Sequence, residues 1–126
     1  MKRVITACIL LLILAGGCAL GYRTVHNYTE ALSVAVDAAR TEALSGKTSE
    51  GARILADAYQ DWKKREPVLC AIVRHTELDQ IENIYLRAIQ AADNDDTHEM
   101  LLQTKELSGM LRHLAEMEAP TMQNIF

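Results

Sequence analysis

Residues 24–44, TVHNYTEALSVAVDAARTEAL, carry the repeat of an amphipathic helix. Apolar side chains recur there in steps of three and four, which places them on one helical face. They are Val25, Tyr28, Leu32, Ala35, Val36, Ala39 and Ala43. Polar residues such as Asn27 and Asp37 fall between them. We therefore expect a helix that buries one face, with Gly46 as the residue just past its end.

Toward the N-terminus, residues 4–22 form an uncharged apolar run, VITACILLLILAGGCALGY. In a helix, these nineteen residues reach about 28 Å, close to the ~30 Å hydrocarbon thickness of a bilayer. No strong helix breaker follows Gly21, so this helix is expected to continue directly into residues 24–44. The sequence predicts a signal anchor, a transmembrane helix, over residues 1–22.

Two alternatives for this segment stay open. Leu14-Ala15-Gly16-Gly17-Cys18 resembles a lipobox, in which Cys18 would be lipidated, although Ala15 stands where leucine is commonest. The small residues 15–17 would also suit a signal-peptidase site in a secreted protein. The length of the apolar run favours the anchor, because a cleaved signal needs only about 7–15 apolar residues.

The charges around the span predict its orientation. Lys2 and Arg3 precede it, whereas only Arg23 follows it closely. By the positive-inside rule the N-terminus is cytoplasmic and the rest of the chain extracytoplasmic. We expect a single-pass protein of the cell membrane, held there by residues 4–22.

Three further helices are expected beyond residue 46. Thr48 or Ser49 would cap the second, whose apolar face is Ile54, Leu55, Ala58, Tyr59 and Trp62. Pro67 either kinks this helix or begins the third, which would run to about residue 92. The apolar face of the third is Ala71, Ile72, Leu78, Ile81, Tyr85, Ala88, Ile89 and Ala92.

The fourth helix begins with a capping box, in which Asp96 is the N-cap and Glu99 reaches back. It carries Met100, Leu101, Leu107, Met110, Leu111, Leu114 and Met117 on its apolar face, and Pro120 ends it. The predicted fold is all-α: a transmembrane helix, then a small antiparallel bundle of three to four helices over residues 23–120. The tail, residues 121–126, either docks through the only Phe of the chain or frays.

Composition excludes some functions. The formal net charge is −4, and Lys63-Lys64-Arg65 is the only basic run, so nucleic-acid binding is not expected. Cys70 is the only cysteine outside the apolar run and is expected to be a small buried hydrophobe. No serine lies in a nucleophile elbow or Gly-rich turn. We predict no catalytic residue and no cofactor.

The densest group of titratable residues is His75, Asp79 and Glu82, which share one helical face. These three are weak candidates for a metal site, since zinc would need a further imidazole from His98 or His113. The favoured interpretation is instead a histidine at the edge of the core, hydrogen-bonded to Asp79. Likewise Tyr28, Tyr59, Trp62 and Tyr85 are expected to be core residues rather than a ligand groove.

Three short segments together resemble the bacterial domain-of-unknown-function family 4363: Asp61-Trp62-Lys63-Lys64, His75 to Glu82, and Asn124-Ile125-Phe126. The resemblance covers roughly residues 20–126. It implies a membrane-associated helical protein of bacteria and no activity. It also implies constrained positions of unknown role at Trp62, His75, Glu77, Asn124, Ile125 and Phe126.

The sequence leaves two hypotheses for function. The first is a non-enzymatic interaction or structural module at the cell envelope, whose partner is another envelope protein. The second is a metal- or ligand-sensing domain, or a small metal-dependent enzyme, that uses His75, Asp79 and Glu82. The oligomeric state is not predicted.

Overall fold

In the computed structural model, residues 1–117 of the chain are described. They form four helices: α1 (Lys2–Leu44), α2 (Thr48–Leu69), α3 (His75–Asp93) and α4 (Thr97–Met117). These described residues contain no strand, which confirms the predicted all-α class. Pro120 and the tail over residues 121–126, for which we made predictions, lie outside the described residues.

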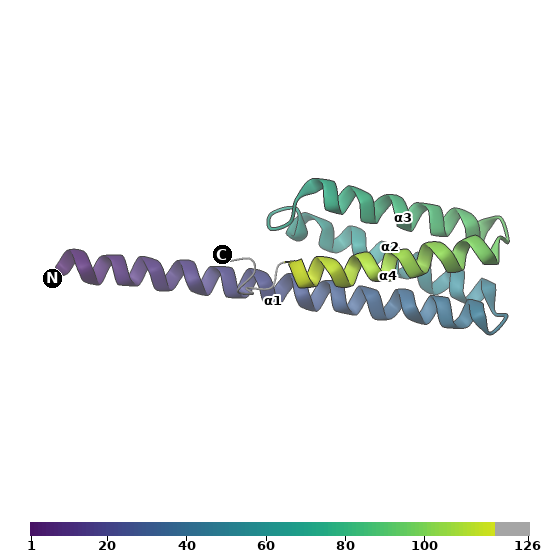
Figure 1. The fold of residues 1–126 in the computed structure, drawn as a ribbon, viewed down its shortest axis with the longest axis horizontal. Coiled ribbons are helices and arrows are strands. Elements are labelled where there is room, and N and C mark those ends of the chain that lie inside the picture. The colour runs from purple at the N-terminus through teal and green to yellow at the C-terminus, as the bar shows by residue number, and fades with distance from the viewer. Residues whose placement is uncertain (118–126) are drawn as a thin grey trace.

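The second half of α1 forms an antiparallel four-helix bundle with α2, α3 and α4 (Figure 1). α1 packs against both α2 and α4, and α3 packs against α4 and, less extensively, α2. Each helix buries the face that its apolar period indicates. The largest fully buried side chains include Trp62, Tyr85, Leu32, Leu55 and Leu107. The sequence pattern did not single out Ile84 and Ala91, which are also buried.

The first half of α1 stands apart from the bundle. α1 is one continuous helix, as predicted, and its N-terminal part projects beyond the other three (Figure 1). Every residue from Met1 to Leu20 is exposed, and Leu12 keeps 72% of its surface. The most apolar 18-residue window of α1 has a mean hydropathy of 2.5 and none of it is buried. By length and composition, this helix is able to cross a membrane.

The turns at the far end of the bundle follow from two residues with positive φ. After α1, Gly46 has φ +87°, and the Lys47 amide donates to the Glu42 carbonyl at 2.9 Å. After α3, Asp95 has φ +56°. Each of these two residues adopts the left-handed conformation just past the end of its α-helix, as in a Schellman motif. That conformation lets backbone amides bond to carbonyls of the last helical turn. The prediction for Gly46 is confirmed.

The observed N-caps agree only in part with those predicted from the sequence. Asp96 accepts the Glu99 amide at 3.0 Å, as predicted, but the Glu99 carboxylate accepts a hydrogen bond from Gln103 instead of reaching back. The predicted cap of α2 is wrong, because Lys47 is its N-cap and makes no side-chain cap. Thr48 instead shares a hydrogen bond with Thr97 across the two turns.

The α2–α3 connection, residues 70–74, is the main correction to the predicted elements. Pro67 lies within the last turn of α2, and α3 begins at His75 after the extended residue Arg74. The proline removes the amide donor that would reach the carbonyl of Lys63 and crowds the preceding turn, and α2 ends two residues later. Ala71 and Ile72, predicted on the buried face of the third helix, are therefore exposed in the connection.

Candidate functional site

His75, Asp79 and Glu82, the weak candidates for a metal site, do not form a metal-binding group in the described residues. His75 and Asp79 are exposed, and within residues 1–117 no hydrogen bond or ion pair joins them. The predicted hydrogen bond between them is therefore wrong. His98 and His113, the proposed additional ligands, are exposed on α4. In the described part of the chain, no group of three or more His, Cys, Asp or Glu residues is able to hold a metal ion.

Glu82 instead links α3 to α2. Its carboxylate accepts hydrogen bonds from the Tyr59 hydroxyl and the Lys63 ammonium, each at 3.0 Å. Lys63 also pairs with Glu66 at 2.6 Å. The hydrogen bond from Lys63, with a smaller contribution from Tyr59, holds the pKa of Glu82 below its usual value, although partial burial opposes this. Burial and then the bond to Glu82 raise the pKa of Tyr59. The cluster has the character of a structural link.

We expect the Glu82→Gln variant to be less heat-stable than the unmodified chain at neutral pH. Because the folded-state pKa of Glu82 is depressed, its contribution is present above the unfolded pKa and is lost as the pH falls through the folded pKa. The melting temperature should fall by roughly 2–4 °C at neutral pH, since the pair is partly exposed. Thermal unfolding followed by circular dichroism measures this difference.

The difference between the two chains should shrink when the same melts are repeated in acid. Glu106→Gln is the matched control, because Glu106 is exposed on α4 and takes part in no ion pair of the described residues. A pH-independent loss in Glu82→Gln would show that the carboxylate charge is not what links the helices.

The aromatic residues form core, as predicted. Trp62 and Tyr85 are fully buried with ring centroids 6.0 Å apart, and Tyr59 lies 5.7 Å from Tyr85. Tyr28 is half-buried against the same core beneath the guanidinium of Arg65. Burial raises the pKa of Tyr85, whose hydroxyl, like the Trp62 indole nitrogen, has no hydrogen-bond partner among the described residues. All four aromatic residues therefore belong to the bundle core or pack against it.

The resemblance singled out six positions, of which three are described. Trp62 is the largest fully buried side chain of the bundle. His75 is the first residue of α3, and Glu77 is half-buried in its first turn, where a carboxylate is favoured by the helix dipole. Asn124, Ile125 and Phe126 lie outside the described residues.

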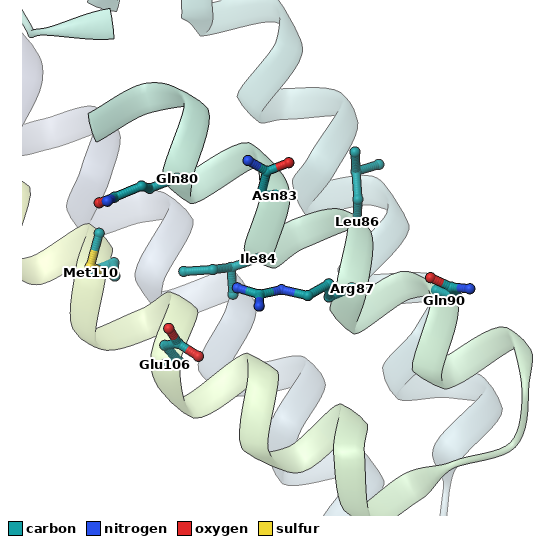
Figure 2. A pocket seen from close by; sticks show the side chains of 8 residues that line it. All are labelled: Gln80, Asn83, Ile84, Leu86, Arg87, Gln90, Glu106 and Met110. Carbon is teal, nitrogen blue, oxygen red and sulfur yellow. The ribbon is translucent and has the colours of Figure 1, made fainter. Parts of the chain in front are cut away.

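A groove of about 540 Å³ runs between α3 and α4 (Figure 2). The buried Ile84 and the half-buried Met110 form its apolar part. Three exposed amides from one face of α3 border it, namely Gln80, Asn83 and Gln90. Arg87 from α3 and Glu106 from α4 also line it, and no ion pair of the described residues involves either.

Sequence reasoning missed this groove. Its residues occupy the polar side of α3, where Gln80, Asn83, Arg87 and Gln90 recur in steps of three and four. The excess of neutral amides over charges in that row was the available signal. Such a surface offers donors and acceptors to another chain.

The three cysteines are free. Cys8 and Cys18 are exposed on the projecting part of α1, and lipidation of Cys18 stays a prediction. Cys70 is only half-buried at the end of α2 and packs against the core. It was expected to be buried, and the structure places it at the edge.

Comparison with known protein families matches residues 19–125 to a domain of unknown function, DUF4363. No curated protein and no solved structure matches the chain. The matched segment begins near the end of the apolar run and includes the whole bundle. It also contains the first two segments on which the resemblance was based, and Asn124 and Ile125 of the third.

Proposed function

The chain belongs to the DUF4363 family, whose function is unknown, and on that premise we propose that it is a non-enzymatic interaction module anchored in the bacterial cell membrane by α1. One observation carries this proposal: an uncharged apolar half-helix, fully exposed, continues without a break into a packed bundle. The anchor is therefore the N-terminal part of α1, and the C-terminal part of the same helix belongs to the bundle.

The exposure of residues 4–20 supports the membrane assignment. Each large aliphatic side chain left in water forgoes about 1.5–3 kcal/mol that burial would supply. Leu10, Leu11, Leu12, Ile13 and Leu14 keep between 62% and 72% of their surface. A bilayer would cover all of them, and a helix satisfies its own backbone groups there.

The charges support an extracytoplasmic bundle. Lys2 and Arg3 lie at the N-terminal end of the apolar run, which by the positive-inside rule belongs in the cytoplasm. Because α1 has no proline or other break between the apolar run and the bundle, the bundle would be held rigidly by its anchor.

The α3–α4 groove is the surface that we assign to the partner, a polypeptide segment of another envelope protein. Asn83 and its neighbouring amides would bond to exposed backbone groups of that segment, and Ile84 with Met110 would take an apolar side chain. Arg87 and Glu106 would gain opposite charges there. The hypothesis of a metal-dependent site has no corresponding support in the geometry.

The test uses the full chain expressed in bacterial membranes, with a photo-crosslinking amino acid at Asn83. We expect one discrete cross-linked protein from Asn83. The same probe at Gln60, which is also exposed but lies on α2, should give none. The protein should also stay in the membrane fraction through alkaline extraction.

A second experiment uses a variant that lacks residues 2–20. This variant should be recovered in the soluble fraction, because the only described helix able to cross a membrane has been shortened to its bundle half. Equal cross-linking from Asn83 and Gln60, or none from either, would contradict the assignment of the groove. Membrane retention of the truncated chain would contradict the anchor.

A further inference from the structure

The α2–α3 connection lies beside the apolar half of α1, at the end of the bundle from which that half projects (Figure 1). Ala71 and Ile72 face a hollow of about 720 Å³ whose other lining residues, among residues 1–117, belong to α1. Those residues are Ile13, Leu14, Ala15, Gly17, Cys18, Ala19, Gly21 and Tyr22. A Cβ atom added at Gly21 would lie 3.9 Å from the terminal methyl of Ile72. The connection is thus level with the end of the apolar run.

The apolar side chains of this corner have no cover within residues 1–117. Ile72 keeps 38% of its surface, whereas Leu69 and Val73 are buried in the core. The exposed Ile72 therefore lies next to a segment that is itself apolar and exposed.

Polar residues frame this corner. Arg23 on α1 and Arg74 at the end of the connection are exposed, and no ion pair or side-chain hydrogen bond of the described residues involves either side chain. Tyr22 ends the apolar run and stacks on His26 with ring centroids 5.7 Å apart. Aromatic and basic side chains in this order are typical of the layer where hydrocarbon meets headgroups.

We propose that the α2–α3 connection is a second membrane contact, in which Ile72 and Ala71 enter the outer leaflet beside α1. This inference rests on the proposed anchoring by α1. The occupant is lipid: acyl chains fill the hollow against α1, and Arg23 and Arg74 meet the phosphate groups. Continuity fixes this choice, since a bilayer around residues 4–22 reaches the level of Gly21 and hence of Ile72.

The second contact would fix the orientation of the bundle relative to the bilayer. Two contacts, the span and the connection, hold the bundle directly on the bilayer rather than at the end of a free stalk. The bundle axis then continues the direction of α1, and the turns after α1 and α3 become the parts farthest from the membrane.

The test places one fluorescent label at a time on the full chain in vesicles of phosphatidylcholine and phosphatidylglycerol, mixed at about 3:1. Cys8 and Cys18 are replaced by serine and Cys70 by alanine, and single cysteines are then introduced at Leu11, Leu44 or Ile72. Leu44 is the matched control, because it is an exposed apolar residue at the far end of the bundle. Quenching is measured with spin-labelled lipids that carry a shallow label, for position 72, or a deep label, for position 11, and with aqueous iodide.

At position 72 we expect quenching by the lipids and an iodide quenching constant roughly threefold or more below that at position 44. If position 72 behaves like 44 while position 11 is quenched by lipid, the second contact is overturned and the anchor stands. If position 11 also fails, the proposed anchor itself is overturned. Protection of position 72 from both quenchers would show that protein covers the corner, by a second copy or by residues 118–126, and would also overturn the proposal.

Discussion

Replacing Trp62 by alanine is expected to lower the free energy of unfolding by about 3–5 kcal/mol. Trp62 has no exposed surface and packs against the ring of Tyr85, so the substitution leaves a cavity that helices on several sides would have to close. For a domain of this size, total stability is about 5–15 kcal/mol. The variant should therefore be close to unfolding at physiological temperature.

The measurement is thermal unfolding of the full chain in mild detergent, followed by circular dichroism. A loss of this size corresponds to a fall in melting temperature of at least ~12 °C. Leu86→Ala is the control, since Leu86 lies on the surface of α3 and keeps 46% of its area. That variant should change stability by less than ~1 kcal/mol. A Trp62→Ala protein that melts within a few degrees of the unmodified chain would contradict a core role.

Trp62→Phe separates the contribution of the indole N–H from that of the side-chain volume. The indole nitrogen has no hydrogen-bond partner among the described residues, so removing it sacrifices no bond within them. Only the volume difference remains, and the loss should be clearly smaller than for alanine. This ranking, alanine well below phenylalanine, is expected if Trp62 acts by filling space.

The helical faces were predictable because their signal is local. Val25, Leu32, Val36 and Ala39 follow the helical period, and all four are buried. Gly46 and Asp96 were also predictable, because a left-handed residue and an N-cap depend on nearby backbone groups. The resemblance to DUF4363 rested on short segments and is confirmed by the match over residues 19–125.

The α2–α3 connection was not predictable from the period. Ala71 and Ile72 extend an apolar row, and a row of this kind is ordinarily assigned to the core. Here they are exposed and face a hollow beside the apolar half of α1 instead of the core. Pro67 suggested a boundary, yet the helix ends only at Leu69. An apolar pattern in the local sequence indicates which side chains avoid water. It does not indicate which part of the surroundings covers them.

The candidate site shows a similar limit. His75, Asp79 and Glu82 do share the predicted helical side, but their partners depend on the neighbouring helix. Glu82 meets Tyr59 and Lys63 of α2, whereas His75 and Asp79 remain exposed. The α3–α4 groove arises from two helices that meet only in the folded chain, so spacing along either helix could not show it.

A close approach of α2 to α1 at Gly51 was also not predictable from local sequence. It gives the second large effect: Gly51→Ala is expected to destabilise the bundle. A Cβ atom at Gly51 would lie 2.6 Å from the Ala39 carbonyl oxygen and 3.3 Å from the Ala43 nitrogen, both of them backbone atoms of α1. Backbone cannot rotate aside as a side chain does, so α1 and α2 would have to separate. Overpacking of this kind costs about 1–3 kcal/mol or more.

Gly109→Ala is the matched control, for which we expect a stabilising effect. Helix propensity favours alanine over glycine at both sites by about 1 kcal/mol. Gly109 is exposed within α4, and an added Cβ meets no atom within 4 Å. Its replacement should therefore raise the melting temperature by several degrees, while Gly51→Ala lowers it. The sign difference between two identical substitutions isolates the contact from propensity. If Gly51→Ala were as stabilising as Gly109→Ala, the close approach of α1 and α2 at Ala39 would not exist in the folded protein.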